Sequence, residues 1–537
     1  MKKSILIFIF FLILTLILRV PTFLRPFDLA YEYQLSFFGR QAFAKDGFYS
    51  SPWSMKGPGE TFVYGLSYLL VGPQYWSLTV RIITALLAGL AAYVVYLTMR
   101  KLYGTDSGFL SALIFVLFLS RDRAFSGTLS YAEMLMPFFT VLGVFFFLEA
   151  QKNKNQKTLF WSGLFFGFSL FFKQSALYDF FPFLFYGMGK SFLETKRILQ
   201  VFKDYLFFVI GFLIPMGIFV SYIFLIGRFP RLWDWMVVKP ILYSKLRERE
   251  VLTYLKSIFK NTYLVWILAS ISLLSALLKR DWKRFIFGFW FLFTFFTFIT
   301  SGKLWNYYFI QPFVPACFLA GTFFSDVLSF KKNIFNRVCF FGILLILMMI
   351  NYQAYQFSFF RFFPLVEKKI TPEDYQFLLS EGEIWIDRYR AASFIREKLR
   401  KEDSVFILEG TPAMYILADR SLVYKDLLFE LQFFENKGIG FAFNHSFQTV
   451  EDNRKILTEN LIKIPPDYIV LVMGSKEETY SKLQSFPYFF AFAFLNYNYV
   501  ANYGDVWIYS KKGETLIPQS VPIEKNFFNK YFGKPNS

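Results

Sequence analysis

Long apolar runs recur along the first 355 residues of the chain, and short polar segments separate them. A membrane-spanning helix needs about 20 predominantly apolar residues, so these runs predict a polytopic α-helical membrane protein. We predict about 11 spans, at 4–20, 78–98, 107–120, 131–149, 158–172, 174–189, 205–226, 262–279, 284–300, 307–325 and 335–355. The runs 107–120, 158–172 and 174–189 are short, which predicts helices that are tilted or broken around a cavity.

The pattern changes after about residue 357. SVFILEG (404–410), DYIVLVM (467–473) and DVWIYSKK (505–512) are short apolar stretches that predict buried strands. RYRAASFIREKLRKED (388–403) has the pattern of an amphipathic helix. We therefore predict two domains, a transmembrane domain over 1–357 and a C-terminal extracytoplasmic α/β domain over 358–537.

A polar, aromatic-rich loop, residues 21–77, separates the first two predicted spans. Asp28, Glu32, Lys56 and Arg81 lie in or next to it, close to a membrane surface, where charged side chains are costly unless they are paired or used. One interpretation gives the acids a structural task only, because Asp28 is a good helix N-cap and Glu32 would complement the helix dipole. The other interpretation makes Asp28 or Glu32 a catalytic carboxylate. A second helix is predicted over 57–70, after a Gly-Pro-Gly turn.

Composition and charge support the membrane assignment. The chain is 55% hydrophobic and 23% aromatic, and its net charge of +19 comes largely from Lys and Arg in short clusters between apolar runs. This is the positive-inside pattern of membrane proteins, so a nucleic-acid partner is disfavoured. With the N-terminus inside the cell, an odd number of spans places the C-terminal region outside. The Met-Lys-Lys start predicts a retained first span with a cytoplasmic N-terminus. One segment assigned to the outside, 227–261, carries eight basic residues, which indicates either a phosphate-bearing substrate or a different span count.

Several kinds of catalytic site are disfavoured. The chain has two cysteines and one histidine, so neither a disulfide framework nor a site rich in Cys or His ligands is available. Leu184 stands where a phosphate-binding loop ending in Gly189-Lys190-Ser191 requires glycine, and no Asp-x-Asp pair occurs. A group donor carried on a lipid phosphate fits better, because its tail dissolves in the bilayer and its phosphate lies beside Lys and Arg at headgroup level. A carboxylate would then deprotonate the acceptor hydroxyl.

A series of motifs occurs in an order that a known family shares. Glu32 stands fifteen residues before Gly47, Lys56-Gly57-Pro58 follows, and Val80-Arg81-Ile82 opens the second span. RKLYG (100–104), SYAEMLMPFF (130–139), GLFFGFSLFFKQSALYDFFPFLFY (163–186), GKLWNYYFIQPFVP (302–315) and VFILEGTPAMYILADRS (405–421) continue the series. Together they resemble the class C glycosyltransferases, specifically the bacterial branch near the dolichyl-phosphate-mannose protein mannosyltransferases and the lipid A aminoarabinose transferases. The resemblance spans nearly the whole chain.

The resemblance implies a metal-independent enzyme without a cofactor, on the outer face of a bacterial inner (plasma) membrane. It implies that a sugar moves, with inversion, from a polyprenyl-phosphate-linked donor to a hydroxyl of an acceptor lipid, glycan or protein. Glu32 would be the catalytic base, with Asp28 as runner-up. The expected ligands of the donor phosphate are Lys56, Lys173, Lys303 and Arg123, and the residues expected to position substrate are Glu133, Arg81, Tyr307 and Tyr308.

The chain departs from the family's pattern at three positions. Glu32 is Glu where Asp is usual, Tyr33 takes the place of a second acid, and Gly57 replaces a proline, which predicts a looser loop. Other functions stay open: a transporter or flippase for lipid-linked glycans, a polymerase or ligase of surface polysaccharide, and a non-catalytic envelope scaffold. Lys173 also fits a snorkelling lysine, and Arg81 a structural partner of an acidic residue.

Overall fold

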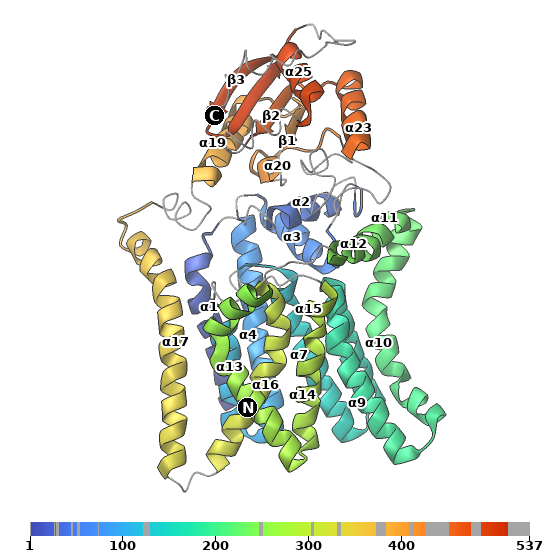
Figure 1. Ribbon diagram of the computed structural model, residues 1–537, viewed down its shortest axis with the longest axis vertical. Helices are drawn as coiled ribbons and strands as arrows, with labels where there is room; N and C mark the ends of the chain where they lie inside the picture. The colour runs from blue at the N-terminus through green and yellow to red at the C-terminus, as the bar shows by residue number, and fades with distance from the viewer. Residues whose placement is uncertain are drawn as a thin grey trace. The chain divides into compact units, whose positions relative to one another are not determined.

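The structure of the protein is a computed structural model, drawn in Figure 1. It describes residues 2–25, 27, 32–43, 47–50, 54–73, 75–121, 129–245, 251–301, 306–329, 334–371, 383–408, 413–424, 450–473 and 485–513. The chain divides into two compact units. Unit 1 comprises Met1–Arg25, Lys56–Pro230 and Ser244–Tyr375, and unit 2 comprises Pro26–Met55, Arg231–Tyr243 and Gln376–Ser537. The predicted domain boundary between residues 357 and 358 stays a prediction.

Unit 1 is built from helices. They are α1 (Lys2–Arg19), α3 (Pro58–Val71), α4 (Trp76–Tyr103), α5 (Thr105–Leu119), α7 (Ala132–Asn153), α8 (Gln156–Phe172), α9 (Leu177–Thr195), α10 (Ile198–Leu225), α13 (Val251–Lys279), α14 (Trp282–Thr294), α15 (Phe296–Ser301), α16 (Ile310–Ser329) and α17 (Ile334–Val366). Short 3₁₀ turns connect some of them, at η1 (Val20–Thr22), η2 (Gln174–Ala176) and η4 (Asn306–Phe309).

Six helical stretches in the described part of the chain are long and apolar enough to cross a membrane. These are Ser4–Thr22, Trp76–Tyr103, Ala132–Asn153, Ile198–Leu225, Thr262–Lys279 and Asn306–Val327. The protein is therefore a multi-pass helical membrane protein, as predicted, whereas the count of about 11 spans stays a prediction.

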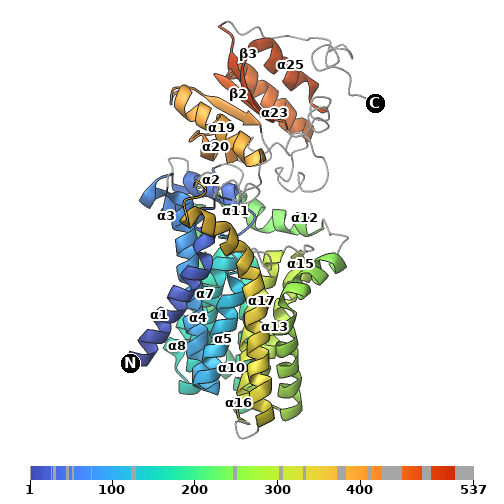
Figure 2. The ribbon, with the colours of Figure 1, turned by 90° about the vertical axis from the view of Figure 1, so that its left-hand side faces the viewer.

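Glycines let helices of unit 1 approach each other closely. α8 packs against both α7 and α10 (Figure 2). A Cβ atom at Gly163 of α8 would overlap the carbonyl oxygen of Phe208 in α10, and one at Gly211 of α10 would overlap that of Phe160 in α8. Small residues at helix contacts are typical of membrane bundles, where van der Waals packing drives association. The position of α8, and of its end at Phe172, is therefore set by its two neighbours.

Unit 2 contains a small mixed sheet. Its strands are β1 (Val405–Leu408), β2 (Tyr468–Val472), β3 (Tyr497–Tyr503) and β4 (Val506–Lys511), in the order β1-β2-β4-β3. β1 and β2 are parallel, with Val405 opposite Tyr468, and β4 is antiparallel to β2 and to β3. The accompanying helices are α2 (Glu32–Phe43), α19 (Glu383–Lys398), α20 (Ala413–Leu417), α23 (Val450–Lys463) and α25 (Pro487–Asn496). β1, β2 and β4 lie in the three predicted strand segments, and a separate extracytoplasmic domain over 358–537 stays a prediction.

α2 belongs with the C-terminal part of the chain. It packs against α20, where Arg40 forms a 3.2 Å ion pair with Asp419 and also donates a hydrogen bond to the carbonyl oxygen of Arg420. The ring of Phe37 lies 6.2 Å from that of Tyr415. The helix that begins at Glu32 is therefore held by residues from the far end of the sequence.

A continuous helical stretch connects the two units along the chain. It consists of α11 (Phe229–Trp233), a wider π-helical turn η3 (Asp234–Val238) and α12 (Lys239–Lys245). Arg231 Nη1 donates hydrogen bonds to the carbonyl oxygens of Tyr49 and Ser50, at 3.3 and 2.7 Å, which attaches this stretch to the loop 21–77 within unit 2.

Candidate active site

Lys56 is placed by the junction between α3 and the end of α8. The next residue, Gly57, is the N-cap of α3, and its N–H donates to the carbonyl oxygen of Phe172 at 3.1 Å. A Cβ atom at position 57 would overlap the carbonyl oxygen of Phe171, so glycine is what allows this approach. The expectation that Gly57 loosens the loop is therefore wrong, because the close contact holds the backbone on which Lys56 stands.

Glu133 bridges two lysines. It is the second residue of α7 and fully buried; its Oε1 accepts from Lys173 Nζ at 2.6 Å and its Oε2 from Lys56 Nζ at 3.0 Å. The lysine side chains are nearly buried too, with 11% of Lys56 and 9% of Lys173 exposed. Charges at this depth require close partners. The Lys56–Glu133–Lys173 cluster supplies them from the α3 junction, α7 and the end of α8.

Three tyrosine rings surround the two lysines. Lys173 Nζ lies 3.6 Å from the ring centre of Tyr308, and Lys56 Nζ lies 5.0 Å from that of Tyr307 and 5.6 Å from that of Tyr131. A ring face attracts a cation, by up to about 2 kcal/mol where water is excluded. Tyr307 and Tyr308 both belong to η4, directly before α16, so this turn covers the cluster.

Glu60 is a fourth charged member of the cluster, which no sequence motif marks. It is fully buried, lies 3.7 Å from Lys56 Nζ, and accepts a hydrogen bond from the N–H of Ala132 at the start of α7. A helix N-terminus favours a carboxylate at this place. In the sequence Glu60 looks like an ordinary first-turn acid of α3, and its four-residue spacing from Lys56 is the one local signal of the pair.

The charges of this cluster balance, since two lysines meet two glutamates. An ammonium group has three N–H donors, and in the described part of the chain Lys173 donates only to Glu133, so donors remain for an oxyanion. Two cations held at a fixed spacing by one carboxylate are suited to binding a phosphate group. No group of three or more His, Cys, Asp or Glu side chains that could hold a metal ion occurs among the residues described.

The other predicted site residues are Glu32, Arg81, Asp28, Arg123 and Lys303. Glu32 is the first residue of α2 in unit 2 and is fully buried. Arg81 is buried in α4, and its predicted role stays a prediction. Asp28, Arg123 and Lys303 lie outside the described residues. The structure thus brings together five predicted site residues, Lys56, Glu133, Lys173, Tyr307 and Tyr308.

Unit 2 contains a buried lysine of its own, Lys239. Lys239 begins α12, directly after the π-helical turn, and its Nζ lies 5.8 Å from the ring centre of Trp235. The side chain is fully buried, and within the described ranges its Nζ has no hydrogen-bond partner. Burial lowers the pKa of Lys239 to about 8, and the charge of Asp234 opposes part of that change. Lys239 is one of the eight basic residues of 227–261, so this segment includes a buried cation.

Residues 55–221 match the sequence profile of the dolichyl-phosphate-mannose-protein mannosyltransferase family. The matched segment includes Lys56, Glu60, Glu133 and Lys173, which are all four charged members of the cluster. No curated protein matches the chain by sequence.

Solved structures of two enzymes are similar to the chain over most of its length. The crystal structure of ArnT from Cupriavidus metallidurans in the apo state has a TM-score of 0.62 at 16% identity, covering 95% of this chain and 99% of that one. The same protein bound to undecaprenyl phosphate has a TM-score of 0.61 at 15% identity with the same coverage. The Archaeoglobus fulgidus oligosaccharyltransferase, tethered with an acceptor peptide, has a TM-score of 0.53 at 12% identity, covering 95% of this chain and 74% of that one. The chain has the fold of the class C glycosyltransferases, and the resemblance that its sequence predicts is confirmed.

Proposed function

We propose that this protein is a membrane glycosyltransferase that moves a sugar from a polyprenyl-phosphate-linked donor to an acceptor hydroxyl on the outer face of the membrane. The observation that carries the proposal is the Lys56–Glu133–Lys173 cluster, whose three charged residues all lie in the segment that matches the mannosyltransferase family. Tyrosine rings pack against both of its lysines. Lysines held this way in a membrane protein suit an anionic group that arrives with a lipid tail. The undecaprenyl phosphate bound by the similar ArnT structure has that chemistry.

In the proposed reaction one bond forms and one breaks at the anomeric carbon. The acceptor hydroxyl oxygen attacks that carbon from the side opposite the phosphate, which inverts its configuration. The bond from the carbon to the phosphate oxygen breaks, and polyprenyl phosphate leaves with the electron pair. Glu32 takes the proton of the acceptor hydroxyl. The reaction needs no oxidant, reductant or further co-reactant.

The lysines act on the leaving group. Lys56 and Lys173 bind the phosphate oxygens as negative charge grows on them, and Lys303 and Arg123 are proposed as further ligands. Fixed donors of this kind contribute about 3–4 kcal/mol each in comparable sites. Glu133 is a positioning residue, because both of its oxygens already accept hydrogen bonds from ammonium groups.

The proposal is tested by donor consumption. The purified protein is incubated with a panel of polyprenyl-phosphate-linked sugars and an acceptor mixture, and release of polyprenyl phosphate is followed by mass spectrometry. We expect the wild type to consume one member of the panel. Glu32→Gln abolishes the transfer while the protein stays folded and inserted, and Lys173→Met lowers the rate by about 10²–10³-fold, the size expected for loss of one charge-stabilising donor.

Lys101→Met is the matched control. Lys101 lies on α4, its 2.9 Å ion pair with Glu149 leaves it 42% exposed, and an exposed pair contributes only ~0–1 kcal/mol, so this variant keeps its rate. Full activity of Glu32→Gln would end the proposed role of this carboxylate. Consumption of an oligosaccharide diphosphate instead would make the protein a polymerase or ligase. Movement of a lipid-linked sugar across vesicle membranes without its consumption would make it a flippase.

A further inference from the structure

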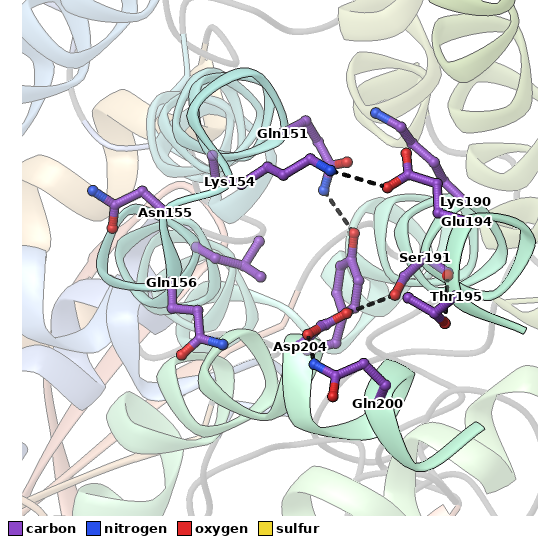
Figure 3. Close-up of a pocket in the computed structure, with 13 residues that line it drawn as sticks. Gln151, Lys154, Asn155, Gln156, Lys190, Ser191, Glu194, Thr195, Gln200 and Asp204 are labelled. Atoms are coloured by element: carbon purple, nitrogen blue, oxygen red, sulfur yellow. Dashed lines mark hydrogen bonds and ion pairs between the residues drawn. The ribbon is translucent and has the colours of Figure 1, made fainter. Parts of the chain in front are cut away.

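A pocket of about 400 Å³, lined mostly by residues of polar types, lies between two interhelical turns of unit 1 (Figure 3). One turn connects α7 to α8 through Lys154, and the other connects α9 to α10 through Lys196. Glu133 stands at the beginning of α7 and the pocket at the opposite end of the same helix, which has 22 residues and is therefore about 33 Å long. The pocket is separate from the Lys56–Glu133–Lys173 cluster.

The pocket lies at the joined ends of α7 and α8 and of α9 and α10. α8 and α10 are in close contact at Gly163 and Gly211, and Gly187 of α9 lies against the ring of Tyr205 in α10. Gln151 of α7 reaches across and donates a hydrogen bond to the hydroxyl of Tyr205 in α10, at 2.6 Å. Polar side chains of all four helices line the space beyond this bridge.

The acidic groups of the pocket already have partners. Glu194 forms a 3.3 Å ion pair with Lys154, and Asp204 accepts hydrogen bonds from Ser191 at 2.7 Å and from Gln200 at 2.6 Å. Lys190, in contrast, makes no hydrogen bond or ion pair with the other side chains drawn in Figure 3. The pocket thus combines satisfied carboxylates with an ammonium group that has donors to spare, which favours an anionic ligand.

The surroundings of the pocket point to a lipid. The same helix ends carry five further basic residues, Lys152, Lys157, Lys196, Arg197 and Lys203. Large apolar side chains are exposed at the end of α9 and the start of α10, with Leu193 at 68% and Leu199 at 74% exposed. A basic polar site beside exposed apolar helix surface matches a molecule with an anionic head and acyl chains.

We propose that this pocket binds the phosphate of an anionic phospholipid from the membrane leaflet on its side, with Lys190 as the principal contact. The acyl chains lie along the exposed apolar side chains of α9 and α10 and cover them as the surrounding bilayer lipids would. The site is independent of the proposed transfer reaction, because it lies at the other end of α7 and its test measures binding alone.

The test is lipid-dependent thermal stability of the full-length protein. Protein purified in a neutral detergent is mixed with dioleoyl phosphatidylglycerol or with dioleoyl phosphatidylcholine, and the unfolding midpoint is measured. We expect the anionic lipid to raise the midpoint by several degrees more than the zwitterionic lipid, because a ligand that binds only the folded state stabilises it. Lys190→Gln loses most of this difference, and Lys190→Arg, which keeps the charge, retains it.

Lys157→Gln is the matched control, since Lys157 is an exposed lysine at the same helix ends that does not line the pocket, and it keeps the full difference. Lys190 makes no pair with the other lining side chains, so its replacement leaves the fold intact. Equal effects of the two lipids, or an undiminished effect in Lys190→Gln, would overturn the proposal. Inorganic phosphate at millimolar concentration is expected to give no shift, and a shift equal to that of phosphatidylglycerol would mean a site for the free ion instead.

Discussion

The bridging carboxylate of Glu133 compensates the charges of two lysines that are largely buried. Each ammonium group alone would be a buried charge without compensation, and tyrosine rings replace only part of a full negative charge. Glu133 contacts both, at 2.6 and 3.0 Å, from a helix start whose N–H groups also favour negative charge. One residue therefore sets both the stability of the site and the spacing of its cations.

We expect Glu133→Gln to keep the shape of the side chain and remove its charge. Breaking a buried ion pair from one side costs about 3–5 kcal/mol, so the unfolding midpoint falls. The rate of donor consumption falls at least about tenfold, because Lys56 and Lys173 lose the partner that holds them at a fixed spacing. Thermal unfolding in detergent and the donor assay measure the two effects.

Glu149→Gln is the control for that variant, on the same helix. Its pair with Lys101 is partly exposed, with 25% of Glu149 accessible, and such a pair contributes about 0–1 kcal/mol. If the two variants lost the same stability, the cluster at Glu133 would contribute no more than a surface pair, and its proposed role would be wrong.

At this scale the sequence singled out residues that the structure brings together, while their contacts could not be predicted and their roles stay predictions. Lys56, Glu133 and Lys173 come from three separate motifs, and their types and order suffice to single them out. The contact of both lysines with Glu133 depends on helix packing, because Lys56 and Lys173 lie 77 and 40 residues from it in the sequence. Glu60 was missed because its four-residue spacing from Lys56 is common on helices, and its other partner is a backbone N–H 72 residues away, which leaves no trace in residue type.

Among the elements, α8 does most to order the candidate site. It carries Lys173 at its end, its last carbonyl groups contact Gly57 beside Lys56, and it packs against α7, which carries Glu133. Its own position follows from the close contacts at Gly163 and Gly211. A substitution that changes the α3–α8 junction is therefore expected to displace Lys56 and Lys173.

Gly57→Ala tests this junction. The added methyl group would overlap the carbonyl oxygen of Phe171, which is helix backbone and has little room to move. We expect a stability loss of about 1–3 kcal/mol, the usual cost of overpacking. The rate falls by up to about 10²-fold, because Lys56 moves with the backbone and small displacements of a catalytic group are costly.

The companion variant is Gly217→Ala on α10, where nothing lies within 4 Å of an added Cβ. Alanine is the better helix former, so this change leaves the rate unaltered and the helix slightly more stable. Equal rates in the two variants would show that the junction does not position Lys56.

Apolar runs predicted where long helices lie better than where they begin or end, and which of these helices cross the membrane stays a prediction beyond the six long apolar stretches. The runs 131–149 and 158–172 coincide closely with α7 and α8, whereas α10 begins at Ile198, ahead of the predicted 205. Lys203 and Asp204 end the apolar run there, but charged residues do not end a helix, and α10 continues through them. The strand β3 was not predicted, because its sequence YNYVANY alternates polar residues on a largely exposed edge.

At the scale of the whole molecule, basic residues mark one end of the unit 1 helices. The turns from α7 to α8, from α9 to α10 and from α13 to α14 carry Lys152, Lys154, Lys157, Lys190, Lys196, Arg197, Lys279, Arg280, Lys283 and Arg284. At the other end of α7 the lysines are paired with Glu133 and Glu60 and are largely buried. An excess of basic residues at the span ends favours the cytoplasmic side, so we propose that the Lys56–Glu133–Lys173 cluster faces outward.

Reporter fusions in a bacterial host test this orientation. Alkaline phosphatase needs disulfides that form only outside the cytoplasm, so it is active only where its fusion point is exported. We expect high phosphatase activity for a fusion after Gly513, beyond β4, and background activity for a fusion in the turn at Lys154. Green fluorescent protein at the same two points serves as the reciprocal reporter. The reverse pattern at both points would place the cluster on the cytosolic side, and transfer on the outer face would then have no cation site to receive its leaving phosphate.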